Sequence, residues 1–169
     1  MIGRRTAICA LLVLSWAGPA SAHDYKLGSL EIATPWTRAT PATAKSGGGF
    51  MTISNKGTTP DRLISARSPA SLKVEIHEMK MDGNVMHMRA VPALDLPKGQ
   101  AVQLKPGSYH LMLMDLKQPL AKDTTVPITL KVELANKRVV EQKVEAKVRD
   151  LTAGNMPAMN HDHGGEHKQ

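Results

Sequence analysis

Cysteine and aromatic residues are scarce in this chain of 169 residues. Cys9 is the single cysteine, and Phe, Trp and Tyr together make up only 3% of the sequence. With one thiol the chain can form no internal disulfide. So few aromatic rings argue against a base-stacking surface for RNA or single-stranded DNA. A Gly-x-Ser-x-Gly elbow and a Walker loop are also missing from the sequence, so we expect a binding protein rather than an enzyme.

The amino terminus has the features of an export signal. Arg4 and Arg5 precede the apolar stretch 7–16, and an A-x-A cleavage sequence ends at Ala22. Because so short a stretch does not span a bilayer, we expect no stable membrane insertion. We expect residues 1–22 to be removed after Ala22 and the remainder to be a periplasmic protein. That remainder contains no cysteine, which excludes thiol exchange and a cysteine nucleophile.

Methionine and histidine are abundant where thiols are missing. The chain from His23 onwards keeps all seven histidines and every methionine except Met1. Loss of Arg4 and Arg5 lowers Lys plus Arg from 22 to 20, against 15 Asp plus Glu, so the net charge becomes +5. The charges of the two signs are interspersed, so we expect a solvated surface and no nucleic-acid partner. An exported, cysteine-free protein with so much imidazole and thioether suggests a metal site.

Hydrophobic alternation predicts an all-β domain over residues 23–149. The clearest alternation places five aliphatic residues on one face of a strand: Val126, Ile128, Leu130, Val132 and Leu134. Turn residues, among them Gly47-Gly48-Gly49 and Asp82-Gly83, separate the other candidates. Those candidates are 28–34, 49–55, 60–66, 72–81, 84–91, 100–104, 109–116 and 140–148. Eight or nine short strands without a helical stripe favour a β-sandwich or a small barrel.

The composition changes after Arg149. Residues 150–169 hold one large aliphatic residue, Leu151, so we expect this tail to remain disordered. The tail is nonetheless dense in metal ligands: Met156, Met159, His161, His163 and His167. A His-rich terminal tract is a compositional signal for metal binding. The alternative is a flexible end without a binding role.

Residues 72–91 are predicted to form a β-hairpin. Asp82-Gly83 between two β-like runs is typical of a two-residue type I′ loop. That loop would place His77 opposite Met88, close enough for both side chains to reach one metal ion, and would pair Met79 with Met86. Strand alternation puts five potential ligands on one face: His77, Met79, Met81, Met86 and Met88. A loop extended to Asn84 would shift the pairing and separate His77 from Met88.

A second strand carries the same chemistry. His110 and Met112 point to one face of this strand, and Leu111 and Leu113 point to the other. Methionine is often core filler, and a lone histidine on an apolar strand is often structural. Two strands that each carry His and Met on one face favour a metal site instead. Thioether sulfur suits Cu(I) better than Zn, Mg or Ca, and the lack of cysteine excludes a blue-copper electron-transfer centre.

The residues His77, Met88, His110 and Met112 have the spacing H-x10-M-x21-H-x-M, which resembles the signature of the PCuAC periplasmic copper chaperones. Shorter runs are also similar to that family: 35–36, 49–53, 61–63, 75–79, 105–107 and 109–113. The resemblance implies a cupredoxin-like Greek-key β-sandwich that holds Cu(I) on these four residues. It also implies delivery of copper to cytochrome c oxidase copper centres such as CuA, with the copper-site subunit or another oxidase assembly chaperone as partner. Some relatives have a Met/His-rich tail that takes Cu(II), which residues 150–169 resemble.

Three other functions fit parts of the sequence. A periplasmic copper storage or resistance protein would buffer copper, chiefly in the tail, without a dedicated acceptor. A copper oxidase of polysaccharides would use the amine and imidazole of an amino-terminal His23, together with a second histidine and an exposed substrate face. A β-sandwich interaction domain would carry its methionines incidentally.

Overall fold

The computed structural model describes residues 24–152, in which all regular structure is β-strand. The strands are β1 (Tyr25–Leu27), β2 (Leu30–Arg38), β3 (Ser46–Asn55), β4 (Asp61–Arg67), β5 (Ser71–Asp82), β6 (Val85–Val91), β7 (Leu94–Leu96), β8 (Ala101–Leu104), β9 (His110–Leu116), β10 (Thr125–Glu133) and β11 (Val139–Arg149). Within this range the chain has no helix of the length and hydrophobicity needed to cross a membrane. The all-β prediction is confirmed. The expected leader and the five tail ligands lie outside the described residues.

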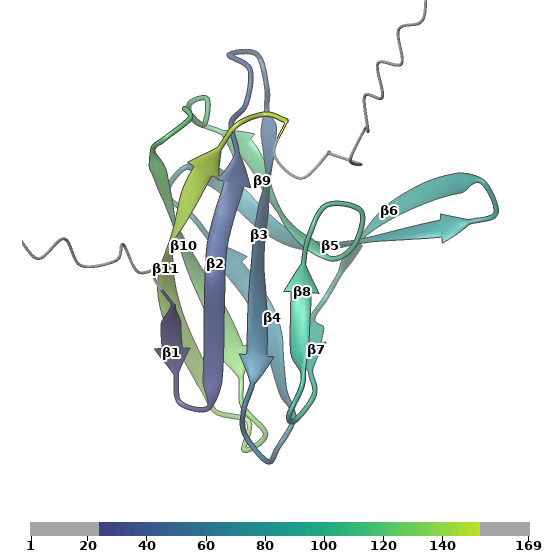
Figure 1. Ribbon diagram of the computed structural model, residues 1–169, viewed down its shortest axis with the longest axis vertical. Coiled ribbons are helices and arrows are strands. Elements are labelled where there is room, and N and C mark those ends of the chain that lie inside the picture. The colour runs from purple at the N-terminus through teal and green to yellow at the C-terminus, as the bar shows by residue number, and fades with distance from the viewer. Residues whose placement is uncertain (1–23, 153–169) are drawn as a thin grey trace, which may run out of the picture.

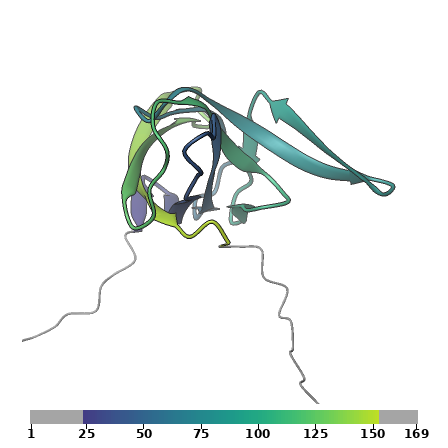
Figure 2. The same cartoon turned by 90° about the horizontal axis from the view of Figure 1, so that it is seen from above.

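Hydrogen bonds join the strands into one continuous sheet. Its order is β6-β5-β9-β3-β2-β11-β10-β4-β7, with β1 paired to β2 and β8 paired to β3. The short β2–β11 pairing is parallel, and strands distant in sequence therefore become neighbours. The sheet curls on itself so that its two halves face each other, as the view from above shows (Figure 2). The far part of the β5–β6 hairpin projects from this body to one side (Figure 1).

The core lies between the facing halves of the sheet. Val126, Ile128, Leu130 and Val132 of β10 are buried, as their alternation predicts, and Leu134 is half-buried. The neighbouring strand β11 adds three further buried residues: Val144, Ala146 and Val148. Because burial of an aliphatic side chain of this kind contributes ~1.5–3 kcal/mol, this ladder anchors one half of the sheet.

The predicted turn at Gly47-Gly48-Gly49 is wrong, because these residues lie inside β3. A Cβ atom on Gly48 would come within 2.7 Å of the Phe50 ring, and one on Gly47 within 3.1 Å of Leu120 Cδ1. Small residues are needed here because neighbouring side chains pack closely over this part of β3. They do not form a turn. The strands β1 and β7 were also missed, since each has only three residues.

The β5–β6 hairpin is confirmed, but its predicted register is wrong. Asp82 pairs with Val85, so the loop is Gly83-Asn84 rather than Asp82-Gly83. Gly83 has a φ of 59° whereas Asn84 has no positive φ, which is typical of a type II′ turn rather than type I′. Met88 therefore lies opposite Met79 and not opposite His77.

The face prediction for the hairpin survives the error in register. Moving the loop by one residue shifts each cross-strand partner by two positions, and side chains two positions apart share a face. The observed register pairs Met79 with Met88 and Met81 with Met86, and His77 with Ala90. The five potential ligands of this hairpin therefore share one face.

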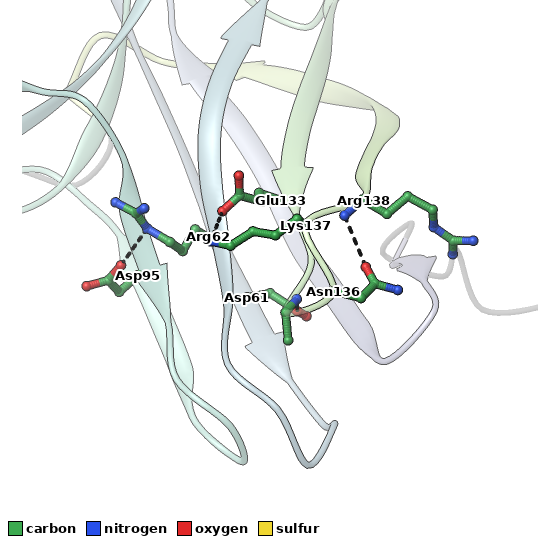
Figure 3. Close-up of polar contacts among 8 residues, drawn as sticks. Asp61, Arg62, Asp95, Glu133, Asn136, Lys137 and Arg138 are labelled. Atoms are coloured by element: carbon green, nitrogen blue, oxygen red, sulfur yellow. Dashed lines mark hydrogen bonds and ion pairs between the residues drawn. The ribbon is translucent and has the colours of Figure 1, made fainter.

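Polar side chains fix the β10–β11 turn against the start of β4 (Figure 3). The buried Asp61 accepts a hydrogen bond on Oδ1 from the Ala135 amide at 3.0 Å. Asn136 accepts one on Oδ1 from the Arg138 amide at 3.1 Å, and Lys137 has a φ of 66°. Residues Asn136 and Lys137 therefore lie in the turn that connects β10 to β11.

Candidate metal centre

Two histidines from different strands lie side by side. β5 pairs with β9 so that His77 is directly opposite His110. Both are buried, with 8% and 5% of their surface exposed. Their ring centroids are 5.7 Å apart and the rings are inclined by 61°. The resemblance to PCuAC proteins implied that these residues share one site, but it did not predict that they are cross-strand neighbours.

Within residues 24–152, each imidazole has one ring nitrogen that makes no hydrogen bond to the protein. His110 donates from Nδ1 to the Ser108 carbonyl at 3.0 Å. His77 donates from Nε2 to Glu75 Oε2 at 2.7 Å, and its buried Nδ1 has no hydrogen-bond partner among residues 24–152. A hydrogen bond on one ring nitrogen fixes the tautomer and leaves the lone pair on the other. His77 Nδ1 and His110 Nε2 are therefore available as metal ligands.

Burial keeps His110 neutral. It lowers the pKa of His110 below the ordinary value near 6.5, and the nearby His77 acts in the same direction, against the hydrogen bond to Ser108. The folded protein thus releases this proton more readily than the unfolded chain. Its contribution to stability is complete above pH 6.5 and declines as the pH falls below that value. A neutral imidazole is the form that binds a metal ion.

Thioethers surround the exposed side of His110. A cavity of about 520 Å³ is lined by His110 and four methionines, Met79, Met86, Met88 and Met112. Phe50, whose ring centroid is 6.4 Å from that of His110, forms part of its wall. Three of the four predicted ligands thus share one cavity. The fourth, His77, is not among the lining residues and lies beside His110.

The other methionines and histidines near the site differ in position. Met81 is exposed and lies opposite Met86 on the hairpin. His87 is exposed and pairs with Lys80 on the reverse face of the hairpin. Met114 is half-buried beside Lys73. Within residues 24–152, no three His, Asp or Glu side chains gather as a metal site, so the candidate centre combines imidazole with thioether.

Aromatic residues support the wall of the cavity. The Trp36 ring packs against Phe50 with centroids 4.5 Å apart, which places Trp36 next to the wall of the cavity. Phe50 has room because Gly48 has no side chain. Gly48 pairs with Met112 of β9, which places this methionine next to the aromatic pair. The glycine run is visible in the sequence, but its role beside the site could not be predicted without the pairing of β3 with β9.

A polar network on the reverse face holds the two histidine-bearing segments together. Arg89 contacts Glu78 Oε2 through Nη2 at 2.6 Å, and Tyr109 donates to Glu78 Oε1 at 2.9 Å. Arg89 lowers the pKa of Glu78 most strongly, and Tyr109 adds to the effect. The Ser108 carbonyl, which accepts a hydrogen bond from His110 Nδ1, also accepts one from the Met79 amide at 3.3 Å. The hairpin and the loop before β9 are therefore fixed relative to each other.

The chain belongs to the LpqE-like family, whose model, described as "Putative lipoprotein LpqE-like", matches residues 30–144. A curated relative from Leifsonia xyli, named as a lipoprotein, is 29% identical over 138 residues, which is 76% of this chain and 80% of the relative.

Solved structures of PCuAC domains have the same fold. The copper-bound PCuAC domain from PmoF2 is 26% identical and covers 76% of this chain and 98% of its own, with a TM-score of 0.64. The Cu(I) form of DR1885 from Deinococcus radiodurans is 28% identical over 77% of this chain and 83% of its own, with a TM-score of 0.55. These matches confirm the resemblance to PCuAC domains and the cupredoxin-like fold.

Proposed function

We propose that the protein is a periplasmic copper chaperone that carries Cu(I) as cargo and delivers it to the copper centres of cytochrome c oxidase, CuA in particular. One observation carries this proposal: two buried imidazoles lie side by side, each with one nitrogen that is not hydrogen-bonded to any residue in 24–152, and His110 lines a cavity together with four thioethers. The two solved relatives named above, which hold copper and Cu(I) respectively, support the choice of metal.

The proposed Cu(I) ligands are His77, Met88, His110 and Met112. Two thioethers and two imidazoles form a soft donor set, which favours Cu(I) over harder divalent ions. Met88 comes from the hairpin and is 50% exposed, whereas the histidines are buried. One ligand at the surface and two below it fit a carrier, because an acceptor can replace the outer thioether first. We assign no catalytic residues to this donor set.

Transfer to an oxidase domain tests the proposed acceptor. The chain from His23, loaded anaerobically with Cu(I), is mixed at two equivalents with the metal-free soluble CuA domain of a cytochrome c oxidase. We expect the CuA absorption to develop after one-electron oxidation, and a His77→Ala/His110→Ala variant serves as the control. Retention of Cu(I) by the parent protein with no CuA signal would instead identify a storage protein.

The five tail ligands, which lie outside the described residues, are proposed as a separate Cu(II) site. Imidazole suits Cu(II), so deletion of residues 150–169 is expected to remove most Cu(II) binding and to leave one Cu(I) per chain. Electron paramagnetic resonance of both forms with one equivalent of Cu(II) measures this. An identical signal from the truncated chain would show that the ligands are in the domain or at the His23 terminus.

A further inference from the structure

The methionines of the hairpin are exposed, which core packing does not explain. Residues 24–152 contain seven methionines, and Met51 is the one buried in the core, with 2% exposure. Met81, Met86 and Met88 are 55%, 50% and 50% exposed. Met81 lies near the end of β5, and Met86 and Met88 lie near the start of β6. The far part of this hairpin projects from the body of the protein (Figure 1).

The register arranges these thioethers in two adjacent rows. Met79 faces Met88 and Met81 faces Met86, all on one side of the hairpin. Cβ atoms of directly opposed residues are about 5 Å apart, and same-face neighbours along a strand are about 7 Å apart. Long, flexible methionine side chains span such distances. The outer pair can thus place two sulfur atoms on one ion.

The rows lead into the candidate metal centre. Met79, Met86 and Met88 line the same cavity as His110 and Met112, so the inner pair and one member of the outer pair already border it. The reverse face carries polar and charged residues instead, including Glu78, Lys80 and Arg89. The hairpin is therefore two-sided, and sulfur is concentrated on the side that faces the histidines.

We propose that Met81 and Met86, assisted by Met79 and Met88, form a second and weaker Cu(I) position through which copper enters and leaves the His77–His110 site. This inference rests on the proposed function. Copper moves by ligand exchange: a bond from Cu(I) to a hairpin sulfur forms as a bond to an inner ligand breaks. The thioethers are neutral and the ion stays Cu(I), so no electron or proton is transferred.

Methyl resonances of methionine test the second position directly. The chain 23–169, labelled with ¹³C at the methionine methyl groups, is titrated anaerobically with Cu(I). We expect the first equivalent to shift Met88 and Met112 and the second to shift Met81 and Met86. Methyl signals of Met81 and Met86 that remain unmoved through two equivalents would overturn the proposal, whether or not the tail methionines respond.

A conservative variant tests the role in transfer. Met81→Leu keeps volume and apolar character but removes the sulfur atom of the hairpin methionine that does not line the cavity. We expect the affinity for the first Cu(I) to be unchanged. We expect the rate of transfer to the CuA domain to fall by about tenfold or more, since removal of a group that supports a metal site typically has at least this effect. Met114→Leu, at a half-buried position beside Lys73, is the matched control.

The outcomes separate this inference from the proposed function. If the parent fails to bind a first Cu(I), the proposed function is wrong. If first binding is intact but the Met81→Leu variant transfers copper at the parent rate, the second copper position is overturned.

Discussion

Replacement of Met112 by alanine is expected to weaken Cu(I) binding by about 100-fold or more. Supporting groups around a metal typically contribute 10–100-fold in affinity, and a direct ligand contributes at least as much. Met112 is half-buried, shares the cavity with His110 and Met88, and lies two residues after the buried His110 on the same face of β9. Anaerobic competition against a chromophoric Cu(I) chelator measures the change.

Met114→Ala is the matched control for this loss. Met114 lies on the same strand and face, but it pairs with Ser46 and Lys73 and does not line the cavity. We expect its Cu(I) affinity to stay close to that of the parent. Equal losses in Met112→Ala and Met114→Ala would contradict the assignment, because they would show a general effect of strand β9 rather than the loss of one ligand.

Leu113→Ala is expected to lower the stability of the fold and to leave Cu(I) affinity unchanged. Leu113 lies between Met112 and Met114, points to the core and is fully buried. Truncation of a buried leucine to alanine costs about 2–5 kcal/mol in the free energy of unfolding, because contacts are lost and a cavity remains. Urea denaturation of the metal-free protein measures the cost, and Cu(I) affinity is measured under conditions where the variant is folded.

Leu72→Ala provides the comparison for stability. Leu72 is 74% exposed, and substitutions at such positions usually change stability by less than about 0.5 kcal/mol. Two results would contradict this prediction. One is a loss in the free energy of unfolding below 1 kcal/mol for Leu113→Ala, and the other is a fall in its Cu(I) affinity comparable to that of Met112→Ala. Either would show that the core and the metal site do not lie on separate faces of β9.

The division of faces was predictable from the sequence, whereas the strand register was not. Alternation along a strand has a period of two residues and depends only on extended backbone, so the common face of Met79 and Met88 follows directly. The position of the loop depends on which residue takes a positive φ. Gly83 has a positive φ at the first loop position, and the cross-strand partner of Met88 is therefore Met79 rather than His77.

Contacts between distant strands could not be predicted from the sequence for a related reason. The pairing of His77 with His110 and of Gly48 with Met112 depends on β9 lying between β5 and β3. Local turn and alternation signals do not specify which strands become neighbours. The glycine run therefore resembled a turn, although it marks the strand on which the Phe50 ring lies.

Cu(I) competition on the chain 23–152, with and without alanine at all four proposed ligands, tests the central claim most directly. This length omits the five tail ligands, so any tight binding must come from the domain. The parent is expected to take one Cu(I) from the chelator, and the variant His77→Ala/Met88→Ala/His110→Ala/Met112→Ala is expected to take none at the same chelator concentration. Uptake of one Cu(I) by this variant with unchanged affinity would contradict the account and place the site elsewhere in the domain.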